Sequence, residues 1–285
     1  MTDNTALAGD AIETPTGKGA GDENFPVASI LISRALRPHV GRFYEFARAA
    51  DDVADNSSLT PEEKLRRLDA FEAGLDGDGP AKATALARSL TETNVTDRHA
   101  RDLLAAFRQD AHKARYADWS ELIDYCTRSA NPVGRYLMDL HGEDRKLWEA
   151  SDALCTVLQI LNHLQDCQKD LAEMGRVYIP EDMLAGEKLT VDVLRNDRTP
   201  PGLRTVLDDM LDRCDDLLVV ARTRPAQPVS RRLHAETAVI TALASRLSAR
   251  LRREDPLAGR VKLSKFDLAM AVLTGMRAFL TPRRG

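Results

Sequence analysis

From Arg34 onward, apolar residues recur three and four positions apart, and β-branched residues seldom alternate strictly with polar ones. Because an α-helix has 3.6 residues per turn, this spacing gathers apolar side chains on one helical face. Residues that break helices separate these segments, at Gly77–Pro80, Asn131–Pro132, Thr199–Gly202 and Pro225–Pro228. The sequence therefore predicts an all-α fold.

Two helix starts are legible in the sequence. In Thr60–Glu63, a threonine suited to the N-cap precedes a proline at the first helical position and a glutamate at the capping-box position. The segment Asp118–Glu121 repeats this logic with an aspartate as the cap. We expect helices to begin directly after Thr60 and Asp118.

The chain has 285 residues and no linker in its middle, which favours one large domain. Residues 1–22 are rich in Gly, Thr and Ala without periodicity, so we expect a mobile segment there and place the domain at residues 23–285. The N-terminus carries acidic residues, and no stretch of about 18 apolar residues occurs. We expect a cytoplasmic protein that is neither secreted nor membrane-spanning.

Charge and cysteine content exclude other classes. The 44 acidic and 40 basic residues give a net charge of −4, which argues against a nucleic-acid partner. The four cysteines lack C-x-x-C spacing and lie in apolar helical stretches, so we expect reduced, buried thiols with neither zinc nor disulfides (Cys126, Cys155, Cys167 and Cys214).

Two aspartate clusters lie about a hundred residues apart, Asp51-Asp52-x-x-Asp55 and Asp166-x-x-x-Asp170. Helical spacing puts four polar residues on one face of each helix: Tyr44, Arg48, Asp51 and Asp55 in the first, and Gln159, Asn162, Asp166 and Asp170 in the second. Both helices are apolar around much of the rest of their circumference, so we expect them to be buried. Buried carboxylates need a compensating cation, and the usual one beside a diphosphate is Mg²⁺.

Each of these features also has a simpler interpretation. An aspartate cluster can be a solvated acidic face, and Arg48 can neutralise Asp51 and Asp52 in a surface ion pair. Tyr125 can be a core tyrosine. The six histidines show no ligand spacing, although His163, beside Asn162, merits a test. The coincidence of two clusters, both in apolar helices, favours a metal site.

The chain resembles the squalene/phytoene synthase family over nearly all of residues 23–280. The residues that carry the resemblance are, in order, Phe43, Tyr44, Phe46, Arg48, Asp51, Asp52, Asp55, Asp110, Arg115, Tyr116, Tyr125, Cys126, Val133, Gly134, Leu158, Gln159, Asn162, Gln165, Asp166, Asp170, Gly175–Pro180 and the basic segment Arg260–Lys265. One departure is that Gln165 stands where the family usually has arginine. With Glu23–Val27 and Asn131–Arg135, this departure makes the chain look like the bacterial hydroxysqualene synthase branch associated with hopanoid biosynthesis.

The resemblance implies an isoprenoid synthase fold, a helical bundle around a central cavity. It implies conversion of presqualene diphosphate and water to hydroxysqualene and diphosphate, with Mg²⁺ or alternatively Mn²⁺ and without NADPH. Metal ligands would be Asp51, Asp52, Asp55, Asn162, Asp166 and Asp170. Diphosphate oxygens would be bound by Arg48, Arg176, Arg260 and Lys265, with Arg48 the foremost candidate. Tyr44, Tyr125 and Gln159 would steer charge or orient water, and Phe25, Leu137, Leu158 and Leu161 would line an apolar chamber.

The resemblance leaves alternatives open. The chain could be a presqualene diphosphate synthase or a phytoene-type synthase that condenses two prenyl diphosphates, or a non-catalytic assembly factor, although its acidic residues are all present. Neighbouring squalene-pathway enzymes are candidate partners. The segment Phe266–Leu280, followed by Pro282-Arg283-Arg284, has an apolar face and a basic end, so transient peripheral contact with the inner membrane is one interpretation. We favour the other, a terminal helix packed on the core.

Overall fold

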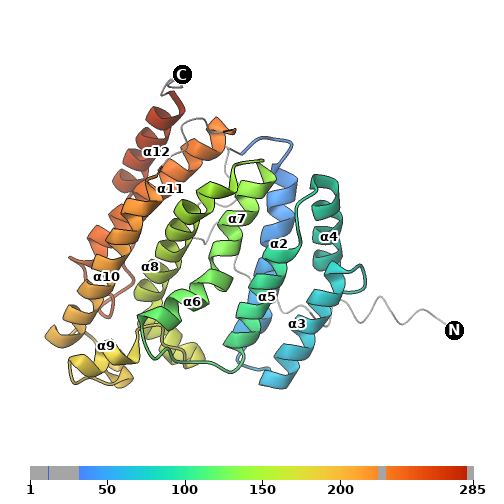
Figure 1. Cartoon of the computed structure of the whole chain (residues 1–285). Coiled ribbons are helices and arrows are strands. Elements are labelled where there is room, and N and C mark those ends of the chain that lie inside the picture. Colours follow the sequence, from blue (N-terminus) through green and yellow to red (C-terminus); the bar gives the residue numbers. More distant parts are fainter. Residues whose placement is uncertain (1–11, 13–31, 224–228, 281–285) are drawn as a thin grey trace. The chain divides into compact units, whose positions relative to one another are not determined.

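The computed structural model describes residue 12, residues 32–223 and residues 229–280 (Figure 1). In these residues the regular elements are α-helices and two short 3₁₀ helices. The all-α prediction is confirmed. The expected mobile segment at residues 1–22 lies, apart from residue 12, outside the described residues, as do Phe25 and the break at Pro225–Pro228.

Two compact units make up the chain, Met1–Lys113 and Ala114–Gly285. We describe each unit by itself. A single domain spanning residues 23–285 stays a prediction.

The described residues of the first unit form the helices α2 (Arg37–Asp55), α3 (Pro61–Leu75), α4 (Ala81–Thr93) and α5 (Arg98–Asp110). Helix α2 contacts the other three. Phe46 of α2 and Phe71 of α3 are fully buried and meet edge to face, with ring centroids 5.8 Å apart. Burial of each such side chain contributes about 1.5–3 kcal/mol to the stability of the fold. This packing holds α2, which carries the first aspartate cluster, in place.

The predicted helix start at Thr60 is confirmed. The Thr60 hydroxyl accepts a hydrogen bond from the Glu63 backbone N–H at 3.3 Å, and α3 begins at Pro61. The turn between α3 and α4 requires glycine twice. Gly77 has φ +104°, and a Cβ on Gly79 would lie 2.6 Å from the Gly74 backbone.

The second unit holds the remaining elements: α6 (Trp119–Ser129), α7 (Asn131–Leu140), η1 (Arg145–Leu147), α8 (Trp148–Met174), α9 (Glu181–Gly186), η2 (Val191–Arg195), α10 (Pro201–Ala221), α11 (Arg231–Leu251) and α12 (Lys265–Leu280). The long helix α8 contacts α6, α7, α10 and α11. Its residues Ile160, Leu161 and Leu164 are almost fully buried. Helix α8 is therefore the central support of the second aspartate cluster.

The expected boundaries at Asp118, Asn131–Pro132 and Thr199–Gly202 are confirmed. Asp118 caps α6 by accepting the Glu121 backbone N–H at 2.9 Å. Asn131 begins α7 directly after the break that ends α6, and α10 begins at Pro201. Three of the four cysteines are buried, whereas Cys155 is half-buried; all four are free.

Helix α12 packs on α11 and lies at the edge of the second unit (Figure 1). The expectation of a terminal helix packed on the core is only partly confirmed. Small residues face α11, and most of the large apolar side chains are exposed (Phe266, Leu268, Val272, Leu273, Met276, Phe279 and Leu280). Among the described residues, no helix combines the length and the apolar character needed to cross a membrane.

Candidate active site

On the polar face of α2, Arg48 forms ion pairs with two aspartates. Its guanidinium lies 2.9 Å from an Asp51 oxygen and 2.6 Å from an Asp52 oxygen. Asp52 is only 5% exposed, and the Arg48 side chain is 18% exposed. The ion pair that the sequence left as an alternative is thus present, but it is largely buried, and a charge pair in that position needs close geometry to offset its lost hydration.

A further carboxylate joins this face from α5. Burial raises the pKa of Asp51 well above its ordinary value, the carboxylates of Asp55, Asp110 and Asp52 raise that pKa further, and Arg48 lowers it. Because 32% of the Asp51 side chain is exposed, repulsion among the carboxylates is the firmer cause. The sequence pointed to Asp110 through the family signature but did not assign it to the site. Its position at the end of α5, buried and near Asp51, is what the tertiary structure adds.

In the second unit, Asp166 of α8 pairs with Arg260. The Arg260 Nε lies 2.9 Å from one Asp166 oxygen, and a terminal nitrogen lies 2.9 Å from the other. Burial raises the pKa of Asp166, Asp170 raises it further, and Arg260 and Lys169 lower it. Arg260, the first residue of the basic segment Arg260–Lys265, therefore lies at the second aspartate cluster. Its role in binding diphosphate stays a prediction.

Gln165 explains part of that placement. Its side chain is buried, and its amide nitrogen donates a hydrogen bond of 2.6 Å to the carbonyl oxygen of Val261, the residue after Arg260. This hydrogen bond holds the backbone of the basic segment against α8, and the amide adds no charge. The departure from the family pattern at Gln165 is thus tied to how Arg260 reaches Asp166.

His163 lies between the polar residues of α8. Its ring stacks on Tyr178 with centroids 3.4 Å apart and planes 11° apart. The Gln159 amide nitrogen lies 3.1 Å from His163 Nε2, and the Asp170 carboxylate lies 3.7 Å from Nδ1. A donating amide makes Nε2 the acceptor and leaves the ring proton on Nδ1, the atom nearer Asp170.

Aromatic rings surround this histidine. Tyr125 lies 5.7 Å from Tyr178 and 5.3 Å from Tyr116, measured between ring centroids. Tyr125 and Tyr116 are both buried. Sequence reasoning singled out Tyr125 and His163 but missed Tyr178, which lies within the signature segment Gly175–Pro180 and was not assigned a role.

The other predicted site residues differ in how far they are buried. Arg176 is buried, with a terminal nitrogen 3.7 Å from the Met174 sulfur, and Lys265 is exposed in the first turn of α12. Asn162 and Tyr44 are half-buried on the polar faces of their helices. Of the proposed chamber residues, Leu161 is buried and Leu137 and Leu158 are half-buried.

Within the described part of the chain, no three His, Cys, Asp or Glu side chains are arranged as a metal site. Arg48 and Arg260 pair with carboxylates that were predicted as ligands. The donor set nevertheless suits a hard divalent cation. All the donors are oxygens, and the crowded carboxylates that raise the pKa of Asp51 carry negative charge that such a cation would relieve.

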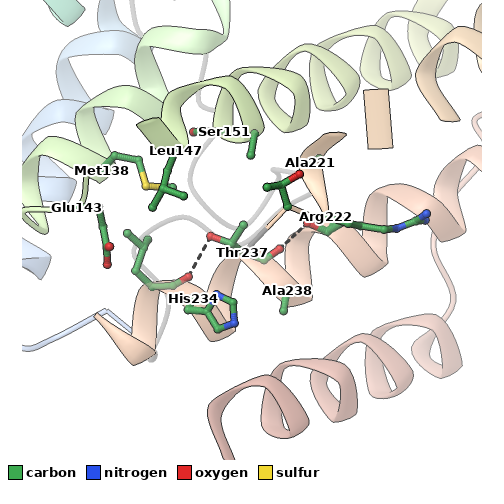
Figure 2. A pocket seen from close by; sticks show the side chains of 13 residues that line it. Met138, Glu143, Leu147, Ser151, Ala221, Arg222, His234, Thr237 and Ala238 are labelled. Carbon is green, nitrogen blue, oxygen red and sulfur yellow. Dashed lines mark hydrogen bonds between the residues drawn. The ribbon is translucent and has the colours of Figure 1, made fainter. Parts of the chain in front are cut away.

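A pocket in the second unit lies elsewhere. Figure 2 shows it between the region of Met138 and Leu147 on one side and that of Thr237 and Ala238 on the other. Glu143, which also lines the pocket, accepts hydrogen bonds from the backbone N–H groups of Val229 and Ser230, directly before α11. None of the predicted site residues lines this pocket. That the chemistry takes place at the aspartate clusters stays a prediction.

Comparison with known proteins identifies the family of the chain. The sequence model of the squalene/phytoene synthase family matches residues 19–267. The chain belongs to the squalene/phytoene synthase family. Among its family relatives is the hydroxysqualene synthase of Rhodopseudomonas palustris, which is 43% identical over 96% of this chain and 94% of its own length. The hydroxysqualene synthase of Sinorhizobium fredii is 42% identical over 90% of this chain and 91% of its own.

Solved structures show the same family fold. The squalene synthase HpnC from Alicyclobacillus acidocaldarius has 32% sequence identity and a TM-score of 0.70, covering 80% of this chain and 87% of its own. A dehydrosqualene synthase in complex with a ligand has 17% identity and a TM-score of 0.75, covering 90% and 91%. At that lower identity the likeness shows the fold alone. The expected isoprenoid synthase fold is confirmed.

Proposed function

We propose that the chain is a hydroxysqualene synthase, which converts presqualene diphosphate and water to hydroxysqualene and diphosphate. The observation that carries the proposal is its similarity to family members of that name, 42–43% identical over 88–96% of the chain. Asp51, Asp52, Asp55, Asp166 and Asp170, the acidic residues that this chemistry calls for, are all present.

In the proposed mechanism, the residues of the two aspartate clusters would hold divalent cations, and these would bind the diphosphate end of the substrate. Asp51, Asp55, Asp166 and Asp170, with Asp52 and Asn162, would hold Mg²⁺ or Mn²⁺. When bound, such an ion supplies positive charge that stabilises the leaving diphosphate. The crowding of carboxylates around Asp51 supports this role, because their mutual repulsion is relieved by a cation.

Basic side chains would bind the remaining diphosphate oxygens. Arg260 already lies against Asp166, and Arg48 lies against Asp51 and Asp52, so each guanidinium stands beside a predicted metal ligand. A planar guanidinium can bind two oxygens of a diphosphate at once, whereas Lys265 would act as a point charge. Arg176 would act like the other arginines.

The carbon–oxygen bond breaks with both electrons going to the diphosphate oxygen. The cyclopropylcarbinyl cation that remains rearranges in an apolar chamber, with Leu158 and Leu161 among its lining residues. A water oxygen then bonds to the cation, and one proton of that water is released. The Gln159–His163 pair would hold this water beside the stacked rings of His163 and Tyr178, which can also stabilise positive charge. No nicotinamide takes part, because no hydride is transferred.

Two other predictions accompany this function. The enzyme would be a carbon–oxygen lyase acting on a diphosphate, with hydroxysqualene passing to later enzymes of squalene and hopanoid synthesis. Peripheral contact with the inner membrane surface and with those neighbouring enzymes likewise stays a prediction.

The test is incubation of the purified chain with Mg²⁺ and presqualene diphosphate, and separately with farnesyl diphosphate, followed by mass analysis of the extracted lipid. Hydroxysqualene from presqualene diphosphate, without nicotinamide, is the expected result. A product from farnesyl diphosphate would instead identify a condensing synthase. No turnover of either substrate would reject the hydroxysqualene synthase assignment and favour a phytoene-type or non-catalytic family member.

A further inference from the structure

Helix α12 presents an apolar face to solvent. Seven of its large apolar side chains are at least 37% exposed, among them Phe266 at 69%, Met276 at 55% and Leu280 at 71%. They occur along the whole helix, from its second residue to its last. A contiguous exposed apolar surface of this kind marks a contact with a partner or a membrane, whereas isolated exposed apolar residues need no explanation.

The side of α12 that faces α11 is built from small residues. Ala271, Gly275 and Ala278 are buried, and a Cβ on Gly275 would lie 2.4 Å from a Val239 methyl carbon and 3.1 Å from the Ala235 carbonyl oxygen. This close approach holds α12 against the unit with its small residues inward. The large side chains are consequently directed away from the α11 interface.

Exposed charge on α12 and just before it is basic. Lys262, Lys265 and Arg277 are exposed, and the sequence continues beyond the helix with Arg283 and Arg284. The acidic residue of α12, Asp267, is turned inward, where its carboxylate lies 2.7 Å from Arg250. Exposed apolar side chains on α12 are therefore accompanied by the positive charge of Lys262, Lys265 and Arg277.

We propose that α12 docks this protein onto an anionic lipid bilayer, with the helix lying in the plane of the surface. An apolar face flanked by basic residues binds such a surface through burial of the apolar side chains and attraction to acidic headgroups. At 16 residues the helix is about 24 Å long, shorter than the roughly 30 Å hydrocarbon core, so it lies on the bilayer. If two α12 helices paired, the basic residues of one copy would lie near those of the other and repel them. The charge pattern therefore favours an anionic lipid surface over a second copy of the chain.

This inference goes beyond the reaction itself, although a substrate with long prenyl chains would be drawn from such a surface. The first experiment is sedimentation of the full-length protein with vesicles of phosphatidylcholine alone and with vesicles that also contain phosphatidylglycerol, an anionic lipid. We expect binding to the anionic vesicles, weakened by added salt, and little binding to phosphatidylcholine. Absence of binding to the anionic vesicles would overturn the proposal.

Substitutions on the exposed face test whether α12 makes the contact. Met276→Glu should weaken vesicle binding about tenfold, and the double variant Val272→Glu/Met276→Glu should weaken it more. Each substitution puts a charge in place of an apolar side chain that would be buried in the bilayer. Lys262→Glu should reduce binding to the anionic vesicles. The matched control is Val219→Glu, which changes an equally apolar residue, 64% exposed, on α10.

Equal binding by Met276→Glu, Lys262→Glu and Val219→Glu would place the lipid contact elsewhere and reject α12. Light scattering provides the second readout. If the parent chain is dimeric and Met276→Glu makes it monomeric, the face is a self-association surface and the proposal fails. Turnover of detergent-solubilised presqualene diphosphate by Met276→Glu should equal that of the parent. Vesicle binding is measured without substrate, so it stands or falls independently of the proposed reaction.

Discussion

At the level of single residues, Asp51 is a predicted metal ligand that lowers the stability of the metal-free fold. Its folded pKa lies well above 3.8, so at a pH between 3.8 and that raised value the folded state holds the proton more tightly than the unfolded state. The contribution of this group to stability therefore falls as pH rises through that window. At a pH above that window and without metal, Asp51 lowers the stability of the fold.

Asp51→Asn should accordingly raise the melting temperature of the metal-free protein at pH 8, and the gain should shrink as the pH is lowered, because the parent carboxyl then becomes protonated. Turnover should fall on the order of 10²-fold or more through the loss of a charged ligand. Differential scanning calorimetry and the lipid assay measure the two effects. Glu45→Gln, on an exposed position of the same helix, serves as the control and should change neither. Undiminished turnover in Asp51→Asn would remove Asp51 from the active site.

Gln165 is predicted to act by positioning Arg260. Gln165→Leu removes the donor to the Val261 carbonyl and should lower the free energy of unfolding by about 1–3 kcal/mol, because it leaves a buried acceptor unsatisfied. It should also raise the KM for presqualene diphosphate more than it lowers kcat. Chemical denaturation and steady-state kinetics provide the measurements.

Gln168→Leu is the comparison. Gln168 also lies on α8, and its amide nitrogen donates a hydrogen bond of 2.9 Å to the Asn196 carbonyl oxygen, but this bond is exposed, so water can replace the lost donor. We expect little effect there. Gln165→Arg tests the departure from the family pattern. Kinetics and products identical to the parent would mean that this departure carries no functional weight.

His163→Phe tests the proposed water site. A phenyl ring can keep the stacking on Tyr178 but cannot hydrogen-bond to Gln159. If the Gln159–His163 pair holds the attacking water, the variant should still release diphosphate while the hydroxysqualene fraction falls and hydrocarbons formed by proton loss rise. Mass analysis of the lipid products, with diphosphate release measured in parallel, decides this. An unchanged product ratio at normal diphosphate release would exclude His163 from water capture.

At the level of elements, the contact between α11 and α12 depends on glycine. Gly275→Ala places a methyl group against Val239 and should lower the free energy of unfolding by about 1–3 kcal/mol, because the well-packed interface must open. Gly41→Ala in α2 is the counterpart. A Cβ there meets nothing within 4 Å, and we expect stabilisation of about 0.5–1 kcal/mol from the better helix former. Thermal unfolding monitored by circular dichroism separates the two. A neutral Gly275→Ala would mean that α12 is loosely held.

At the level of the whole molecule, the proposed mechanism requires ligands from both units. Mg²⁺ with inorganic diphosphate should therefore stabilise the parent chain, by about 2.7 kcal/mol at a hundred times the Kd. The shift should disappear in Asp166→Asn as well as in Asp51→Asn. If one of the two variants keeps the full thermal shift, the clusters do not bind a common ligand. Asp78→Asn, in the exposed turn between α3 and α4, is a control that should keep the shift.

Much of the molecule follows from the sequence alone. Helix type and many boundaries are local properties, set by the spacing of apolar residues, by caps such as Thr60 and Asp118, and by prolines and glycines at breaks. For the same reason, the sequence could place Asp51 and Asp55, or Asp166 and Asp170, on one helical face. The family signature added the expected fold and chemistry.

The tertiary structure decided what depends on contacts between distant segments. The approach of Asp110 to Asp51, the pairing of Arg260 with Asp166 and the hydrogen bond from Gln165 to Val261 join residues on different elements, and no local pattern specifies them. Helix α12 shows the same limit. Its sequence has an apolar face of large side chains and small residues on another side, and periodicity could not tell which of the two would be buried. The close fit of Ala271, Gly275 and Ala278 against α11 selects the small side chains for the interior and leaves the large ones exposed.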